Sequence, residues 1–217
     1  AWDPNINVTI ETMLVRGSTV YLGGRFTAIN GGTVRNRAAA VDATTGAARA
    51  FDPNLDGEVE SIDVLNSTVY LGGAFTTANG GTGRNRLAAV DADTGTLVAW
   101  NPNANNAVST LAVSGSNVYA GGSFTSIGGQ TRNRIAAIDT STGSATTWDP
   151  NPAGNAVNVI SLSGSVMFVG GFYTHMSGQI RNRIAAIDTS TGNVTSWNPN
   201  ISSGGAVVNA LAFSGTT

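Results

Sequence analysis

Acidic side chains are concentrated in one short segment, where they are the strongest candidates for chemistry. Asp56, Glu58, Glu60 and Asp63 lie within LDGEVESIDV, and Glu11 precedes Glu60 by 49 residues. Carboxylate oxygens are the ligands that Ca²⁺ prefers, and a pair of carboxyl groups can act as general acid and base. The sequence contains no D-x-[DN]-x-[DN]-G calcium loop. We therefore favour a solvated acidic surface and keep a calcium site or an acid/base pair as the alternative.

The single histidine is the only other residue with an obvious catalytic chemistry. His175 lies in FYTHMSG, where the corresponding segments elsewhere in the chain read FTAINGG, FTTANGG and FTSIGGQ. One histidine without any cysteine does not make a zinc site of the usual nitrogen and sulfur type. The sequence predicts an exposed loop residue, with a ligand contact as the alternative. We predict no catalytic residue and no metal ligand set.

Arginine is the most strongly patterned polar residue, and it returns in the triplet R-N-R. Eight of the eleven arginines belong to these triplets: Arg35, Arg37, Arg84, Arg86, Arg132, Arg134, Arg181 and Arg183. The guanidinium groups could form a ring that binds an acidic glycan or another anion. They could equally bridge carboxylates and carbonyls within a blade or between blades. Recurrence in every repeat favours the structural role, because one binding site rarely needs four copies.

Composition excludes several classes of function. The net charge is −2 and lysine is absent, so no basic field invites nucleic acid. The longest unbroken apolar runs are four residues, whereas a membrane-spanning helix needs about 20. The chain has no cysteine, which excludes disulfides, thiolate metal sites and a cysteine nucleophile.

Four markers recur in one frame and define a repeat of 48 to 49 residues. The tripeptide D/N-P-N occurs five times, each time directly after a large aromatic residue: Trp2, Phe51, Trp100, Trp148 and Trp197. Gly-Gly pairs and R-N-R triplets follow the same spacing. We place the repeats at approximately 6–54, 55–103, 104–151 and 152–200, with a partial fifth at 201–217, as one propeller segment of a larger protein.

Within each repeat the periodicity is that of short strands. Segments rich in Val, Ile, Thr and aromatics alternate with Gly, Asn, Asp and Ser at about ten-residue spacing. The turn D-x-x-T-G closes one hairpin per repeat, with Asp binding main-chain N–H groups and Gly supplying a positive φ. The sequence predicts an all-β fold: a β-propeller of four-stranded antiparallel blades, with four complete repeats and partial blades at both ends.

The segments AAVDADTGTLVAW and AAIDTSTGSATTW carry A-x-D-x-x-T-G-x-x-x-W. This pattern resembles the tryptophan-docking motif of quinoprotein-type propellers, in which the indole wedges between blades. Together with V-Y-x-G-G-x-F-T and R-N-R, the unit resembles an uncharacterised family of bacterial secreted β-propeller repeats. The resemblance implies that Trp2, Trp100, Trp148 and Trp197 are structural. Phe51 stands where the motif has Trp, which predicts a weaker contact there.

These observations favour a non-catalytic binding or architectural module of an extracellular or cell-surface protein. The expected partner is a protein or a glycan, with no cofactor, no nucleic acid and no membrane insertion. A lectin-like propeller is one alternative, and the non-catalytic part of a larger propeller enzyme is another. The resemblance implies the fold without the activity, because quinoprotein dehydrogenases use calcium and an adjacent-cysteine disulfide and this chain has no cysteine.

Overall fold

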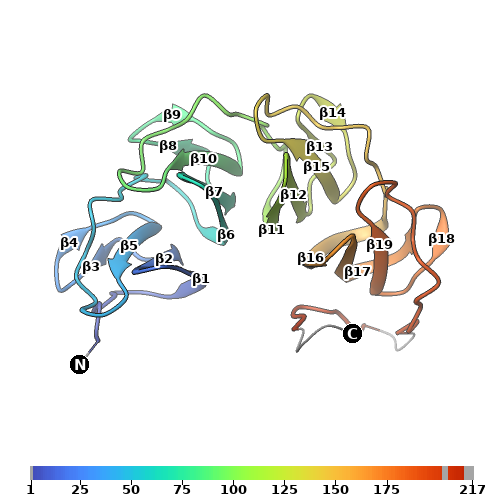
Figure 1. Ribbon diagram of the computed structural model, residues 1–217, viewed down its shortest axis with the longest axis horizontal. Coiled ribbons are helices and arrows are strands. Elements are labelled where there is room, and N and C mark those ends of the chain that lie inside the picture. Colours follow the sequence, from blue (N-terminus) through green and yellow to red (C-terminus); the bar gives the residue numbers. More distant parts are fainter. Residues whose placement is uncertain (1, 202–204, 213–217) are drawn as a thin grey trace.

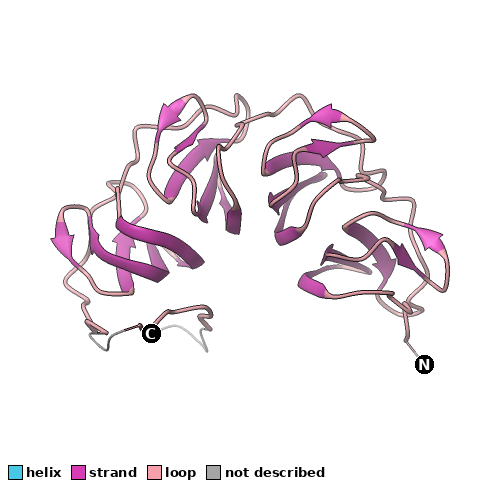
Figure 2. Ribbon diagram, turned by 180° about the vertical axis from the view of Figure 1, so that it is seen from behind, coloured by secondary structure: helices cyan, strands magenta, loops and turns pink. Residues whose placement is uncertain are grey.

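The computed structural model describes residues 2–201 and 205–212, and they form four β-sheet blades in an open arc (Figure 1). Seen from behind, the described chain consists of strands and loops throughout (Figure 2). Among these residues there is no helix of the length and apolarity needed to cross a membrane. The predicted β-propeller fold is therefore confirmed. Of the predicted partial fifth repeat, residues 202–204 and 213–217 lie outside the described residues.

Each blade is built on three antiparallel strands, of which the first lies nearest the centre of the arc (Figure 1). The first blade contains β1 (Ile10–Arg16), β2 (Thr19–Gly24), β3 (Ala28–Ile29), β4 (Thr33–Val34) and β5 (Ala38–Asp42). The second contains β6 (Val59–Leu65), β7 (Thr68–Gly73), β8 (Thr77–Ala78), β9 (Thr82–Gly83) and β10 (Leu87–Asp91). The third contains β11 (Val108–Ser114), β12 (Asn117–Gly122), β13 (Ser126–Ile127), β14 (Gln130–Thr131) and β15 (Ile135–Asp139). The fourth contains β16 (Ala153–Ser163), β17 (Val166–Met176), β18 (Gln179–Ile180) and β19 (Ile184–Asp188).

In the first three blades the Gly-Gly pairs end the middle strands, and the inner strand bulges against them. The register shifts between Val59 and Ser61 where β6 pairs with β7, and Val108 and Thr110 show the same shift in the next blade. A Cβ placed on Gly73 would lie 2.0 Å from the main-chain oxygen of Glu58. Only glycine fits so close a backbone approach.

The predicted fourth strand is shorter than expected. It is reduced to one bridge pair per blade, such as Val41 with Ala48 and Ile138 with Ala145. The reason is local: the D-x-x-T-G turn uses Gly46 at φ 75°, and the chain then leaves the sheet to carry its aromatic residue to the next blade. The main sheets of the first three blades therefore have three ladder strands and a single bridged outer segment, and in the fourth blade β18 also pairs with β17.

The hydrophobic core consists of layers between successive blades. One layer joins Tyr21 and Ala40 of the first blade to Phe51, Val59 and Leu71, all at most 5 % exposed. Alanine in the third strands keeps the sheets close enough for these contacts. The second and third blades thus bury both faces against their neighbours, which is why their middle strands are apolar on both faces.

Candidate functional site

The docking aromatics lie between blades. The Trp100 ring is 3 % exposed and packs edge-to-face on Tyr70, with centroids 5.2 Å apart. Its Nε1 donates to the main-chain oxygen of Asp139 in the next blade at 2.8 Å. Phe51 takes the same place on Tyr21 and is fully buried, but it has no N–H to donate. Trp2 and Trp197, at the two ends of the arc, are each 42 % exposed.

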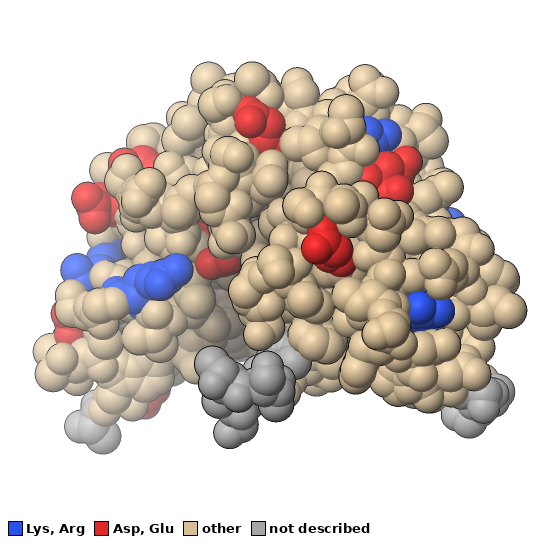
Figure 3. Space-filling model, turned by 45° about the vertical axis from the view of Figure 1, so that its right-hand side comes forward, with Lys and Arg blue, Asp and Glu red and all other residues tan. Residues whose placement is uncertain are grey.

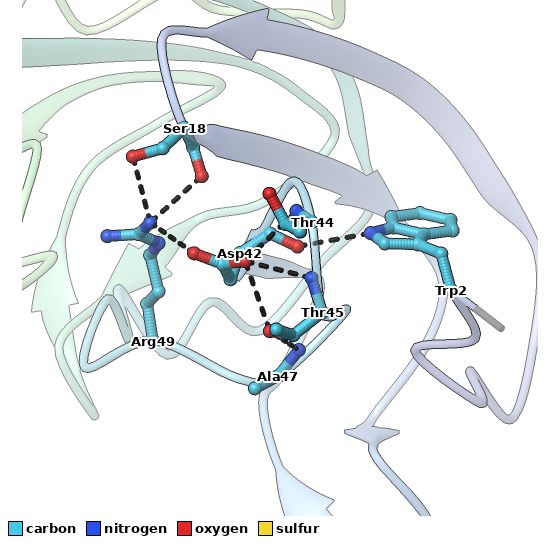
Figure 4. A network of polar contacts seen from close by, with 7 residues as sticks. All are labelled: Trp2, Ser18, Asp42, Thr44, Thr45, Ala47 and Arg49. Carbon is cyan, nitrogen blue, oxygen red and sulfur yellow. Dashed lines mark hydrogen bonds and ion pairs between the residues drawn. The ribbon is translucent and has the colours of Figure 1, made fainter.

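The D-x-x-T-G turns have the predicted hydrogen bonds, as Figure 4 shows for the first blade. Asp42 Oδ1 accepts from the N–H groups of Thr44 and Thr45, both at 2.9 Å. Asp42 Oδ2 pairs with Arg49 at 2.8 Å, and its main-chain oxygen accepts the indole N–H of Trp2 at 3.1 Å. Hydrogen bonding, from the Thr45 N–H first of all, lowers the pKa of the Asp42 carboxyl. This carboxylate is committed to the turn.

The first arginine of each triplet connects parts of its own blade. Arg35 donates to the main-chain oxygens of Val34 at 2.8 Å and Arg49 at 2.9 Å. Arg181 donates in the same way to Ile180 at 2.9 Å and Thr195 at 2.8 Å. Carboxylate contacts are longer and occur at two of these arginines, Arg35 with Asp52 (3.7 Å) and Arg132 with Asp149 (3.9 Å).

The rest of the triplet also makes scaffold contacts. Its second arginine has a positive φ in every blade and donates to nearby main-chain oxygens: Arg37 to Arg25, Arg86 to Ala74, Arg134 to Phe124, and Arg183 to Tyr173. The triplet asparagine reaches the D/N-P-N asparagine, as in Asn36 Nδ2 to Asn54 Oδ1 at 2.8 Å. These geometries favour the structural interpretation of R-N-R over an anion-binding ring.

The acidic segment divides into three parts, of which Asp56 is the first. Asp56 Oδ1 accepts from the N–H groups of Thr76 at 2.7 Å and Thr77 at 2.9 Å. Asn7 and Asn105 make the same contacts in other repeats. Burial opposes ionisation here, but the hydrogen bonds from Thr76 and Thr77 outweigh it and lower the pKa of Asp56 to about 2.

Asp63 belongs to a different contact, between blades. Its Oδ2 accepts the main-chain N–H of Val113 on β11 at 2.6 Å, and two residues earlier Ser61 Oγ accepts the N–H of Leu111 at 2.9 Å. Thr110 repeats the arrangement by accepting the N–H of Ile160 on β16 at 3.2 Å. Side chains of one inner strand thus accept hydrogen bonds from main-chain N–H groups on the edge of the next inner strand. An edge strand has unpaired N–H groups, which these contacts satisfy.

The remaining acidic residues line a pocket at the centre of the arc, which we call the axial pocket. Its volume is about 540 Å³, and seven residues form its wall: Glu11, Arg25, Glu58, Glu60, Ser109, Asn158 and Asn209. Four of them hold one repeat position on the innermost strands, because the spacing from Glu11 to Glu60, Ser109 and Asn158 is 49 residues each time. The blades therefore present Glu, Glu, Ser and Asn in turn to the same space.

Charge within the axial pocket is partly balanced. Arg25 Nε lies 2.8 Å from Glu58 Oε1 and 3.3 Å from Glu11 Oε1. Burial raises the pKa of Glu60, and the charges of Glu58 and Glu11 add to this, whereas Ser109 and Arg25 oppose it. Within residues 2–201 and 205–212, no three His, Cys, Asp or Glu side chains are arranged to hold a metal ion. The pocket presents carboxyl, amide, hydroxyl and guanidinium groups suited to hydrogen bonding.

His175 lies elsewhere, and the expected loop is wrong. It belongs to strand β17, which runs without a break from Val166 to Met176 and pairs with Ala153 and Ile180 on either side. Its Nδ1 contacts Thr174 Oγ1 at 3.0 Å and its side chain is exposed. This position lies in a strand in every blade, because its counterparts Ala28, Thr77 and Ser126 belong to β3, β8 and β13. In the fourth blade the strand also runs through residues 172–174, where the other blades have a break between two strands.

Sequence reasoning missed four residues of the axial pocket. Ser109 and Asn158 could have been found by extending the 49-residue spacing from Glu60. Asn209 follows Asn158 by 51 residues, so a strict period passes over it. Arg25 has no counterpart, since the other repeats place Ala74, Ser123 and Phe172 there. Residues that differ between copies leave no repeat signal.

The surface has few charges. In the view of Figure 3, acidic and basic side chains of the described residues are scattered among uncharged ones and form no continuous patch of one sign. This agrees with the 11 % charged residues of the chain.

Antiparallel blades, aromatic wedges between them and a polar axial pocket define a β-propeller. The chain belongs to the family described as outer membrane protein assembly factor BamB, whose sequence model matches residues 8–214. This confirms the predicted relationship to quinoprotein-type propeller repeats. The search of curated proteins gave no match.

Solved structures share the fold. The computationally designed protein Ika8 has a TM-score of 0.55 at 14 % identity, covering 85 % of this chain and 47 % of Ika8. The designed protein Ika4 has a TM-score of 0.54 at 17 % identity, covering 83 % of this chain and 91 % of Ika4. BamB from Moraxella catarrhalis has a TM-score of 0.50 at 21 % identity, covering 82 % of this chain and 45 % of BamB. The chain thus spans about half the length of Ika8 and BamB.

Proposed function

We propose that this chain is a non-catalytic binding module of an extracellular or cell-surface protein, and that its ligand enters the axial pocket. The module uses no cofactor. Its partner is a protein, of which an extended or projecting polar segment contacts the pocket wall. Glu60, Ser109 and Asn158 are the residues that we assign to ligand contact.

One observation carries the proposal: the recurring polar residues are engaged in the scaffold, and the axial pocket is where the repeats differ. Asp42 and its counterparts hold turns, and Arg35 and its counterparts hold main-chain oxygens. At one repeat position that lines the axial pocket, by contrast, the side chain changes from Glu60 to Ser109 to Asn158. Recognition of an asymmetric ligand would account for this variation.

The family supports a protein as the partner. Its description names an assembly factor, which is a protein that acts by contacting other proteins. Because the chain covers 45 % of the Moraxella catarrhalis BamB chain, an assembly role comes to this chain as part of the proposal. The composition supports export, since lysine is absent and only 11 % of the residues are charged.

A lectin-like function is the second candidate, and the chemistry of the pocket wall favours it. Glu60, Asn158 and Asn209 offer acceptors and donors side by side, with Asn158 Nδ2 2.7 Å from Asn209 Oδ1. Paired carboxyl and amide groups of this kind bind sugar hydroxyls through networks of neutral and charge-assisted hydrogen bonds.

Binding to arrays of extended peptides and of glycans distinguishes the two candidates. The chain should bind a subset of peptides saturably, and Asn158→Ala should weaken that binding while Asp93→Asn, on an exposed turn, leaves it unchanged. Saturable binding to one sugar class with the same variant pattern would establish the lectin-like function instead. Absence of saturable binding to both arrays, or binding insensitive to Asn158→Ala, contradicts a ligand site in the axial pocket.

A further inference from the structure

Another pocket lies between the first and second blades, and we call it the junction pocket. Its volume is about 420 Å³, and five residues line it: Arg16, Tyr21, Val64, Leu65 and Asn66. The first two come from β1 and β2, and the other three come from the end of β6 and the turn that follows it. The volume is in the range of small-ligand sites. The junction pocket is formed by two neighbouring blades and shares no residue with the axial pocket.

Arg16 is the residue that distinguishes this junction from the others. The same repeat position holds Leu65, Ser114 and Ser163 in the following blades, so the repeats share no need for a cation there. Its Nη2 donates to the main-chain oxygen of Val64 at 3.1 Å, which directs the guanidinium across to the second blade. Among the residues that the structure describes, Arg16 forms no ion pair. The side chain is exposed, so its other N–H groups can reach a ligand.

The rest of the wall is mainly apolar. Tyr21 and Val64 are 5 % and 7 % exposed and form the floor, and Leu65 is half-buried beside them. The Tyr21 hydroxyl is already engaged, because it donates to the main-chain oxygen of Ala92 at 3.0 Å. Asn66 is exposed at the turn and adds an amide group. A guanidinium beside an apolar surface and a neutral amide fits a carboxylate that is attached to an apolar group.

The charges around the junction pocket favour a ligand with a single negative charge. Among its five wall residues, Arg16 alone is charged. Burial raises the pKa of the Tyr21 hydroxyl, and the negative charge of Asp93 adds to this, whereas Arg49 opposes it. The Asp93 charge therefore acts on the Tyr21 side of the pocket and disfavours a doubly charged anion. A carboxylate carries one charge, and a guanidinium can bind it through two parallel hydrogen bonds.

We propose that the junction pocket binds the C-terminal residue of a peptide, with the α-carboxylate on Arg16 and an apolar side chain against Val64 and Leu65. The Asn66 amide donates to the same carboxylate. A chain end with an apolar last residue combines both groups in one residue, whereas an Asp or Glu side chain supplies the charge without the apolar group. This site goes beyond the function proposed for the axial pocket, and neither depends on the other.

A titration followed by amide NMR spectra tests the site. The probes are the peptide acetyl-Gly-Ala-Leu with a free carboxylate and the same peptide as its C-terminal amide. The free acid should shift the signals of Leu65 and Asn66 saturably, and the amide should bind roughly tenfold or more weakly. Arg16→Ser installs the residue type of the third and fourth blades and should weaken binding of the free acid to the same extent, with little change in the melting temperature. Ser114→Ala, at the equivalent position of the third blade, is the matched control and should leave the affinity unchanged.

Four outcomes overturn the proposal. Equal affinity for the acid and the amide excludes a carboxylate site, whatever the variants do. Unaltered affinity in a folded Arg16→Ser chain removes Arg16 from the site. Saturable shifts from inorganic phosphate at the same concentrations contradict selection for an apolar carboxylate. Shifts confined to Ser109 and Asn158, without any at Leu65 or Asn66, place the peptide in the axial pocket, which contradicts the junction site and leaves the proposed function standing.

Discussion

The indole Nε1 of Trp100 donates a 2.8 Å hydrogen bond to the main-chain oxygen of Asp139, the first residue of a turn in the next blade. Trp148 repeats this contact with Asp188 at 3.3 Å. Trp100 and Trp148 therefore each connect the middle strand of their own blade, through an edge-to-face contact with a tyrosine, to the turn of the following blade. The contact explains why the aromatic residue and the turn recur together at a fixed spacing.

Removing one buried docking ring should destabilise the chain strongly. Trp148 is 6 % exposed and packs on Tyr119 with centroids 5.3 Å apart. Trp148→Ala should lower the free energy of unfolding by about 3–5 kcal/mol, measured by denaturant titration. Trp197→Ala is the control and should cost markedly less, because that ring is 42 % exposed. Equal losses for the two variants would show that blade docking does not depend on burial of the ring.

Restoring the consensus tryptophan at position 51 should destabilise the chain rather than stabilise it. The turn approaches this segment closely, since a Cβ on Gly95 would lie 2.6 Å from Asp52 N, against 3.3 Å from Asn101 N for Gly143. Phe51 is also fully buried. Overpacking should make Phe51→Trp cost about 1–3 kcal/mol in a denaturant titration. A gain in stability would mean that the hydrogen bond added by the indole N–H outweighs the cost of overpacking.

Asp63 should be needed as a hydrogen-bond acceptor and not as a charge. Its carboxylate accepts the N–H groups of Val113 at 2.6 Å and Val64 at 2.8 Å. Asp63→Ala leaves these donors unpaired and should cost about 1–3 kcal/mol, whereas Asp63→Asn keeps an acceptor and should cost less. Unfolding midpoints of the two variants decide the point, and a larger loss for Asn than for Ala contradicts this role.

Glu60 should make the chain less stable as the pH rises. Burial raises the pKa of Glu60 in the folded chain, so the folded state holds this proton more tightly than the unfolded state does. That contribution is complete below the ordinary glutamate pKa of about 4.3 and is lost as the pH rises through the higher folded value. Glu60→Gln should remove this fall in the melting temperature between about pH 4 and pH 7. An unchanged pH profile in Glu60→Gln contradicts the raised pKa.

Calcium should not stabilise the chain. Asp56 and Asp63 are engaged with main-chain N–H groups, and Glu58 and Glu11 are paired with Arg25. Melting temperatures in millimolar calcium and in chelator should agree. A clear rise with calcium, abolished in Glu58→Gln, would restore the cation site that the acidic segment suggested.

The sequence was sufficient to predict the fold because the same structural residues recur at a fixed spacing. The docking ring at Trp100, the close backbone approach at Gly73 and the turn carboxylate at Asp42 each recur in the other repeats. The pattern therefore identifies the strand, the turn and the docking residue together. The acidic segment was different, since Asp56, Glu58 and Asp63 are neighbours in sequence but face a loop, the axis and the next blade. Which way a side chain faces depends on partners some 20 to 50 residues away, such as Thr76 and Val113. His175 was placed in a loop because a glycine-rich turn follows it closely, whereas this position forms a short strand pairing in every blade, as at Ser126 and Ile127 in β13.

The most direct measurement compares ligand binding and stability in one pocket variant. Ser109→Arg places a large cation in the axial pocket at a position where the repeats already differ. For a peptide selected from the array, isothermal titration should show binding to the unaltered chain and a loss of roughly tenfold or more with Ser109→Arg, while the melting temperature stays the same. Unaltered affinity in a folded Ser109→Arg chain would contradict the assignment of the axial pocket as the binding site.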